Sequence, residues 1–211
     1  MTAGYSSWLT RIASTISTLT ASDISRFVPP ADFDGREGAV LILFGDTQGI
    51  PDIVVIQRAS GMRQHPGQAA FPGGGVDGEE NVVDAALREA QEEIGLDPQS
   101  VEIIGELPRL WVSVSGYAVT PVVAYWHSPH EISPQDFNEV ARVERISLAD
   151  LVNPDNRVRV RHQSGFIGPA FLIRDLTIWG FTGGLLDRLL EVFGFAQDWD
   201  QSNIIDLADE D

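Results

Sequence analysis

Apolar residues recur at helical spacing near both ends of the chain. Residues 176–193 carry an apolar stripe that includes Ile178, Leu185 and Leu189, and this stripe predicts an amphipathic helix. Residues 1–27 repeat the pattern with a stripe made of Trp8, Leu9, Ile12, Ile16 and Leu19. We expect this segment to form a helix that docks on the core.

A further helix is predicted at residues 82–94, where Ala90 and Ile94 share an apolar face and no Pro or Gly interrupts the pattern. Asn81 is a suitable N-cap residue, and Gly95 is a stop signal. The helix therefore has a predicted start and a predicted end.

Short apolar runs predict strands. Residues 39–44 and 53–56 flank a run of turn residues, so we expect a hairpin. Pro121 is expected to break its own strand or to place it at a sheet edge. The other predicted strands are residues 101–107, 117–126, 140–146 and 157–161.

The segment between the hairpin and a glycine run is expected to be a long ordered loop. Arg58 ends the second strand, and residues 59–70 contain Gly61, Pro66 and Gly67. Loops of this length in compact domains are usually functional. The loop leads to Gly73, where glycine lets the backbone approach a ligand closely.

Length and composition favour one well-buried domain with terminal additions. The chain has 211 residues, of which 43% are hydrophobic. We expect a helical extension at residues 1–30, the main domain at residues 31–196 and an acidic tail at residues 197–211. Six acids and no base lie in the last 14 residues, so the tail is expected to be solvated and mobile.

The charge excludes several partner classes. A net charge of −17 argues against binding to nucleic acids or anionic membranes, which need a basic surface. The chain has no Cys, so disulfides and thiolate chemistry are excluded. Neither a membrane span nor a secretory signal is recognisable. We therefore expect a cytoplasmic protein whose ligands are small molecules.

Three carboxylates are predicted to converge on one face of the helix at residues 82–94. At about 100° per residue, Glu89, Glu92 and Glu93 project within roughly a 100° arc. Like charges at this spacing repel, so the patch is either a solvated face relieved by Arg88 or a site for a hard divalent cation.

Spacing favours the cation site. The residues of this stretch match GX₅EX₇REUXEEXGU, the Nudix box, where U is an apolar residue. A match of this length is expected by chance in on the order of one in ten million chains. The chain therefore resembles the Nudix hydrolases, which cleave a nucleoside diphosphate linked to another group. The matching positions are Gly74, Glu80, Arg88, Glu89, Ala90, Glu92, Glu93, Ile94, Gly95 and Leu96.

A second pattern lies directly upstream and resembles the signature of the coenzyme A pyrophosphatase branch of that family. It includes an RxHxGQ core. The two patterns together cover residues 58–96, under a fifth of the chain. The upstream positions are Arg58, Ala59, Arg63, His65, Gly67, Gln68 and the Phe71-Pro72-Gly73-Gly74 run.

The resemblance implies a fold and an activity. The fold is a Nudix-type α/β/α sandwich with a mixed central sheet. The activity is Mg²⁺- or Mn²⁺-dependent hydrolysis of the diphosphate linkage of coenzyme A or acyl-coenzyme A. The products are 3′,5′-ADP and 4′-phosphopantetheine or its acyl form.

The resemblance also implies the metal site. Glu89 and Glu93 correspond to the primary ligands, and Glu92 to a ligand through water or to a support of the other two. The carbonyl of Gly73 corresponds to a position that joins the metal shell. Arg88 is expected to orient carboxylates by bidentate hydrogen bonding.

The remaining roles concern substrate and support. Glu80 is expected to brace the turn into the helix through Arg88. Arg58, Arg63 and Gly74 are the candidates for substrate binding, with the two arginines holding phosphates. The general base stays open among three residues, because family members draw it from different places: Glu92, Glu93 and Glu139.

Two alternatives remain open. The chain is either a hydrolase of another nucleoside diphosphate derivative, such as ADP-ribose or a dinucleotide, or a non-catalytic module that senses a nucleotide. Such modules tend to lose box glutamates, and here Glu80, Glu89, Glu92 and Glu93 are all present. The resemblance also allows a homodimer.

Overall fold

The computed structural model describes residues 6–25, 27–30, 33–62, 65–112 and 116–207. Arg63, one of the two predicted phosphate-binding arginines, lies outside the described residues. The helices are α1 (Ser7–Ile16), α2 (Ala21–Ile24), α3 (Val82–Ile94), α4 (Leu148–Val152) and α5 (Gly180–Val192), with short 3₁₀ turns η1 (Pro98–Ser100) and η2 (Pro154–Asn156).

The larger of two sheets has eight strands within the described residues, with the central order β3-β2-β1-β7-β5. β1 and β7 run parallel and the other pairs run antiparallel, so the sheet is mixed. β4, β6 and β8 pair with β1, β7 and β2 respectively. The strands are β1 (Arg36–Thr47), β2 (Ile50–Arg58), β3 (Ala69–Ala70), β4 (Gly73–Gly75), β5 (Val101–Glu106), β6 (Leu110–Val112), β7 (Tyr117–Trp126) and β8 (Val140–Ser147).

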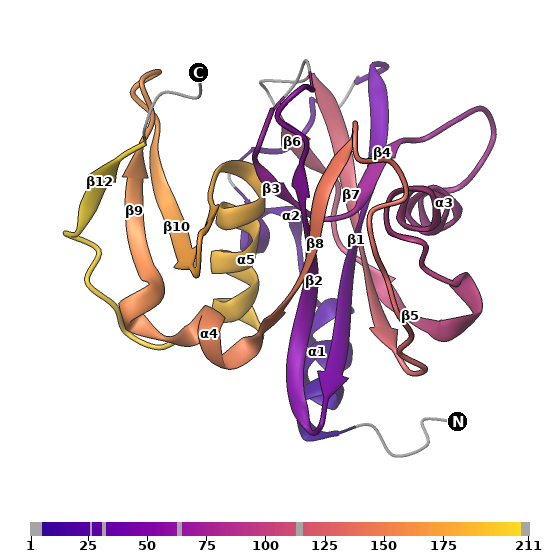
Figure 1. Cartoon of the computed structure of the whole chain (residues 1–211), viewed down its shortest axis with the longest axis horizontal. Helices are drawn as coiled ribbons and strands as arrows, with labels where there is room; N and C mark the ends of the chain where they lie inside the picture. Colours follow the sequence, from indigo (N-terminus) through magenta and orange to yellow (C-terminus); the bar gives the residue numbers. More distant parts are fainter. Residues whose placement is uncertain (1–5, 26, 31–32, 63–64, 113–115, 208–211) are drawn as a thin grey trace.

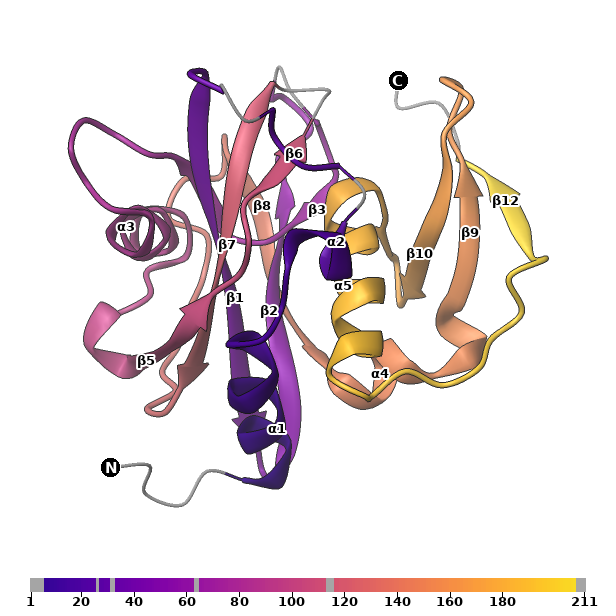
Figure 2. The same cartoon turned by 180° about the vertical axis from the view of Figure 1, so that it is seen from behind.

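Helices cover both faces of this sheet, as the predicted sandwich requires. Figure 1 shows α3 on one side and α5 on the other, and Figure 2 shows α1 and α2 on the same side as α5. Alternation along β1 explains the two layers, because Leu41 and Leu43 pack in the cluster under α3, whereas Ile42 and Phe44 pack in the cluster under α1 and α5.

Three predicted elements are confirmed. β1 and β2 form an antiparallel hairpin that is longer than the two apolar runs. The amino-terminal helix is present, and Leu9, Ile12 and Ile16 are buried. α3 spans the predicted residues, and the Asn81 side chain accepts hydrogen bonds from the amides of Val83 and Asp84.

The prediction for residues 176–193 was wrong at its start. Residues 176–178 form strand β11 (Leu176–Ile178), and the helix begins only at Gly180. Leu176 and Ile178 are buried, and they satisfy a strand period as well as a helical one. Pairing with β10 (Ile167–Ile173), a strand that the sequence pattern did not reveal, decides between the two.

The prediction for Pro121 was also wrong. β7 continues through Pro121 and lies between β1 and β5. Beside Pro121 the neighbouring chain passes from β5, which ends at Glu106, to β6. The missing N–H of Pro121 therefore falls in a gap between two partners, while its carbonyl accepts the amide of Leu107 at 2.8 Å.

A smaller sheet lies beyond α5 (Figure 1), with the order β11-β10-β9-β12. Its outer strand, β12 (Ile204–Asp206), comes from the predicted acidic tail and runs parallel to β9 (Arg157–Arg161). The ring of Trp199 also lies 4.6 Å from the guanidinium carbon of Arg157. The described part of the tail is thus held against the molecule, in contrast to the mobile segment that its composition predicted.

Candidate active site

The connection from β4 to α3 brings the predicted site residues together. β4 pairs with β1, with Ala39 opposite Gly74 and Val40 opposite Gly73. The chain then turns through residues 76–81 and returns as α3, which packs against β1 and β4. The inward face of α3 therefore lies on the glycine strand.

Glu93 is buried against the start of β4. Its side chain turns inward from the last turn of α3, and the residue is 7% exposed. The backbone amide of Gly73 donates a hydrogen bond to its Oε2 at 2.9 Å. Burial is the main cause that raises the pKa of Glu93 to about 8. The hydrogen bond from Gly73 and the charge of Arg58 oppose this net rise, and the carboxylates of Glu89 and Glu139 contribute to it.

Glu89 occupies the space beside the next glycine. A Cβ atom at Gly74 would lie 2.4 Å from Oε1 of Glu89, and the contact would involve the whole carboxylate. Only glycine therefore lets this carboxylate approach β4 so closely. Burial raises the pKa of Glu89, and a hydrogen bond from Arg88 opposes the shift.

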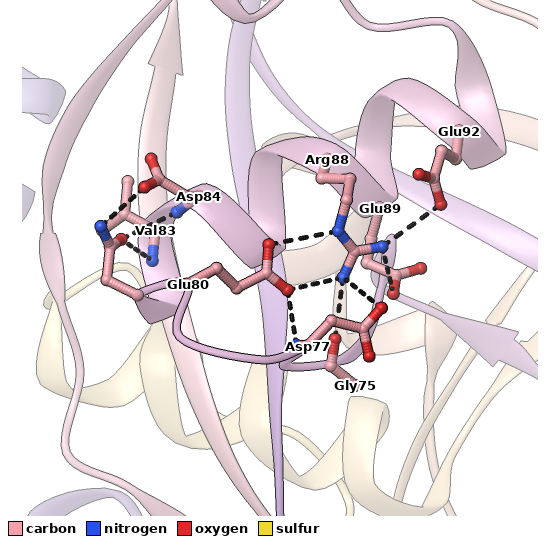
Figure 3. A network of polar contacts seen from close by, with 9 residues as sticks. Gly75, Asp77, Glu80, Val83, Asp84, Arg88, Glu89 and Glu92 are labelled. Carbon is pink, nitrogen blue, oxygen red and sulfur yellow. Dashed lines mark hydrogen bonds and ion pairs between the residues drawn. The ribbon is translucent and has the colours of Figure 1, made fainter.

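Arg88 links both ends of the turn into α3 (Figure 3). It donates to the two carboxylate oxygens of Glu80 at 2.8 and 3.2 Å, and to the carbonyl of Gly75 at 2.9 Å. It also donates to Glu89 at 3.0 Å. The expected contact between Glu80 and Arg88 is thus present, and it lowers the pKa of Glu80.

Glu92 stands apart from the buried pair. Its side chain is 61% exposed and accepts one hydrogen bond from Arg88 at 3.3 Å. The predicted convergence of three carboxylates is therefore corrected: Glu93 turns inward to Gly73, while Glu92 remains on the outer side. Accordingly, no three carboxylate or imidazole groups among the described residues are arranged to hold a metal ion by themselves.

The two inner carboxylates nevertheless fit a hard divalent cation. Mg²⁺ keeps several waters and takes one or two protein carboxylates together with substrate oxygens. Glu89 and Glu93 lie against adjacent glycines and repel one another electrostatically, which a cation between them would reverse. The carbonyl of Gly73, the residue whose amide binds Glu93, completes the proposed donor set.

Arg58 and Glu139 flank Glu93. Arg58 is the last residue of β2, and its buried Nε has no hydrogen-bond partner among the described residues. Glu139 is exposed, and its backbone carbonyl accepts the amide of Ala59 at 2.8 Å. Both side chains act electrostatically on Glu93. The structure therefore gathers Arg58, Glu139 and Glu93 from three separate segments of the chain.

The loop after Arg58 is closed at its base. The amide of Arg58 donates to the carbonyl of Gln68 at 2.9 Å, and Nε2 of Gln57 donates to the carbonyl of Gly67 at 3.0 Å. β3 then pairs with β2. These contacts hold both ends of residues 59–68 beside Arg58, the residue whose charge acts on Glu93 of the box.

The sequence did not single out two groups in this network. The carbonyl of Gly75 accepts from Arg88, and the amide of Asp77 donates to Glu80 at 2.6 Å. Both are backbone groups, and the spacing of side-chain types carries no signal for them.

Comparison with known proteins now identifies the family. The NUDIX domain model matches residues 35–164. The chain belongs to the Nudix family. It is 36% identical to the Nudix hydrolase NudL of Enterobacter sp. (strain 638) over 167 residues, which cover 73% of this chain and 81% of the relative. It is 34% identical to NudL of Citrobacter koseri over 191 residues, which cover 82% and 94% of the two chains.

Solved structures share the fold. The Nudix hydrolase RenU of M. smegmatis aligns with a TM-score of 0.55 at 19% identity, covering 80% of this chain and all of RenU. A Nudix hydrolase from Nitrosomonas europaea aligns with a TM-score of 0.51 at 15% identity, covering 83% and 81% of the two chains. At this identity the likeness concerns the fold alone.

Membership of the family defines the broad chemistry. The protein is a Nudix hydrolase, a class that acts on small nucleotide substrates with divalent metal ions. No helix in the described part of the chain is long and apolar enough to cross a membrane.

Proposed function

We propose that this Nudix hydrolase cleaves the diphosphate linkage of coenzyme A or acyl-coenzyme A, releasing 3′,5′-ADP and 4′-phosphopantetheine or its acyl form. The observation that carries the proposal is the position of Arg58, the first residue of the upstream pattern. Its buried Nε has no hydrogen-bond partner in the described part of the chain, and its charge acts on Glu93, a glutamate of the box. The two patterns therefore meet at one site.

The proposed substrate-binding role rests on the buried Nε of Arg58, for which the described residues supply no acceptor. A buried guanidinium N–H without an acceptor costs free energy, and a phosphate oxygen would satisfy it. Arg63 and Gly74 complete the proposed substrate contacts, Arg63 by its place in the pattern and Gly74 by the room that it leaves beside Glu89.

The proposed metal site consists of Glu89, Glu93 and the Gly73 carbonyl, with Glu92 linked to it through Arg88. A bound Mg²⁺ or Mn²⁺ ion neutralises phosphate charge and lowers the pKa of water. Arg88 and Glu80 keep the turn and the Glu89 carboxylate in position. The hydrogen bond from Gly73 holds the Glu93 carboxylate against β4.

Hydrolysis requires one oriented water and one proton acceptor. The water oxygen bonds to phosphorus, the bridging P–O bond breaks, and the water proton passes to a base. We place the base among Glu93 and Glu139, which act on each other electrostatically beside Arg58. Glu92, the third candidate, is exposed and held by Arg88.

Product identification by mass spectrometry tests the proposal. Purified protein is incubated with coenzyme A and Mn²⁺, and Glu93→Gln is the matched control. We expect 3′,5′-ADP and 4′-phosphopantetheine from the native protein and neither product from the variant.

ADP-ribose and dinucleotides are assayed in parallel. Cleavage of one of these while coenzyme A stays intact would replace the proposed substrate and keep the hydrolase. Binding of nucleotides with no cleavage of any would indicate a sensing module.

A further inference from the structure

On the side away from α3, strand β4 has a space over Gly75 that no described residue fills. The Cβ direction of Gly74 points toward Glu89 and α3, because a Cβ built there would overlap the Glu89 carboxylate. Successive residues of a strand face opposite sides. Gly75 therefore faces away from α3, and no atom of the described residues lies within 4 Å of a Cβ built on it.

Pairing with β1 gives the same orientation independently. Gly75 lies directly opposite Gly38, and directly opposed residues face the same side of a sheet. A Cβ on Gly38 would lie 3.3 Å from Cδ1 of Tyr117. The ring of Tyr117 therefore lies beside Gly38 and Gly75, a flat part of the sheet surface from which no side chain projects.

A cation lies on that ring. Arg36 and Tyr117 are neighbours across the parallel pair of β1 and β7, and the guanidinium carbon of Arg36 lies 4.5 Å from the centroid of the Tyr117 ring. Arg36 and Tyr117 thus form a cation–π pair, the Arg36–Tyr117 stack, beside the space over Gly75.

This arrangement is directly joined to the proposed metal site. The carbonyl of Gly75 accepts a hydrogen bond from Arg88, which also donates to Glu89 (Figure 3). Gly75 is two residues from Gly73, about 7 Å along a strand. A ribose spans such a distance, and the proposed path of the nucleotide runs around the edge of β4, which pairs only with β1 among the described strands.

We propose that the base of the bound nucleotide stacks in the space over Gly75, against the Arg36–Tyr117 stack. The proposal rests on the proposed function in placing a diphosphate at Gly73 and Glu93. A flat π-system fits here because the glycines leave the sheet surface flat, and because the Tyr117 ring and the Arg36 guanidinium can both stack on a base. The proposed function makes this ligand an adenine nucleotide.

Titration calorimetry with ADP and, separately, inorganic pyrophosphate in the presence of Mg²⁺ tests the proposal, since only ADP has a base. Stacking of one base on an aromatic ring corresponds to roughly a 5- to 150-fold change in affinity. We expect Tyr117→Ala to weaken ADP binding within that range and Tyr117→Phe to restore it. Pyrophosphate binding should not change in either variant.

Gly75→Ala provides a second probe that removes no contact. Its methyl group would occupy the open space and weaken ADP binding several-fold. Gly184→Ala is the matched control, because a Cβ on Gly184 also meets no described atom within 4 Å and Gly184 lies in α5, outside the proposed site. Its ADP affinity should equal that of the native protein.

Two results would overturn the proposal: native ADP affinity in both Tyr117→Ala and Gly75→Ala, or equal losses of ADP and pyrophosphate affinity. Should Tyr117→Ala fail to fold, Gly75→Ala decides. A coenzyme A cleavage assay separates the two proposals. If coenzyme A stays intact but Tyr117→Ala weakens ADP binding, the proposed function fails and the base site is supported. If coenzyme A is cleaved but Tyr117→Ala binds ADP as the native protein does, the base site is rejected.

Discussion

The backbone amide of Gly73 and the carboxylate of Glu93 are joined by a hydrogen bond of 2.9 Å across the interface between β4 and α3. This contact keeps an acidic side chain in a buried position beside a second glutamate, Glu89. Burial makes the ionised form of Glu93 unfavourable, and this free-energy cost falls at the place where a cation and a diphosphate are expected to bind.

Substitutions of the glutamates should differ in their effects. We expect Glu93→Gln to lower kcat by about 100-fold or more, because it removes a proposed ligand and proton acceptor. Glu92→Gln should lower kcat by less than about tenfold, since Glu92 is exposed and touches the site through Arg88. Steady-state kinetics with Mn²⁺ measures both. Equal losses in the two variants would contradict the division between inner and outer carboxylates.

Metal-free protein should lose stability as pH rises. The pKa of Glu93 is raised to about 8 in the folded protein from a usual value of 4.5. Between these two pH values the unfolded chain releases this proton while the folded protein keeps it, so the free energy of unfolding falls, by a few kcal/mol in total. Urea unfolding of chelator-treated protein at pH 5 and pH 8 measures the fall.

Glu93→Gln is the control for this pH dependence, because an amide does not titrate. At pH 8 the variant should therefore be more stable than the native protein. This advantage of the variant should shrink or reverse toward pH 5. Added Mg²⁺ should stabilise the native protein most at high pH, where the carboxylate is ionised. A difference that stays constant across this range would show that the folded-state pKa of Glu93 is ordinary.

Arg58→Ala should impair catalysis without weakening the fold. The buried Nε of Arg58 has no hydrogen-bond partner among the described residues, so its removal breaks no such contact there. We expect kcat/KM to fall by about 10- to 100-fold with an unchanged Tm.

Arg142→Ala is the opposite case and serves as the control. Arg142 also has a buried Nε that finds no partner among the residues described, but its Nη1 donates to both oxygens of Asp175 at 2.9 and 3.0 Å. We expect a lower Tm and a native kcat/KM. A drop in Tm for Arg58→Ala as large as that for Arg142→Ala would argue against the substrate-binding role of Arg58.

Arg88 should be coupled more strongly to Glu80 than to Glu92. The first pair shares two hydrogen bonds, and its Glu80 side chain is 19% exposed. The second pair has one bond of 3.3 Å and a Glu92 side chain that is 61% exposed. Double-mutant cycles on thermal unfolding should give a coupling at least about twice as large for the first pair. Equal couplings would mean that Glu80 does not brace the turn.

Trp199→Ala should destabilise the protein without changing the active site. The guanidinium of Arg157 lies between the rings of Phe171 and Trp199, at 4.3 and 4.6 Å from their centroids. Loss of the outer ring opens the buried Arg157 to solvent, and we expect the free energy of unfolding to fall by about 1 to 2 kcal/mol. Trp199→Phe should restore most of it. Native stability in Trp199→Ala would show that the tail is held by β12 alone.

Local signals in the sequence were sufficient for α3 and its contents. Asn81 caps the helix through its own side chain, and the apolar period ends at Ile94. The spacing of Glu80, Arg88, Glu89 and Glu93 places these residues on consecutive turns of one helix or at its entry, so the motif and the family followed from the sequence. The order of apolar and polar residues also predicted the β1–β2 hairpin and the helical cover at the amino terminus.

The tertiary structure decided what depends on partners distant in the chain. Leu176 and Ile178 fit a helix or a strand, and only the presence of β10 selects the strand. Glu92 and Glu93 are adjacent in sequence, yet contact with Gly73 buries one and leaves the other in solvent. The Arg36–Tyr117 stack exists because β1 and β7 pair in parallel. Periodicity records which face of an element is apolar, but not which element packs against it. The packing partner decides which side chains are buried, which carboxylate pKa values shift and where space remains, as over Gly75.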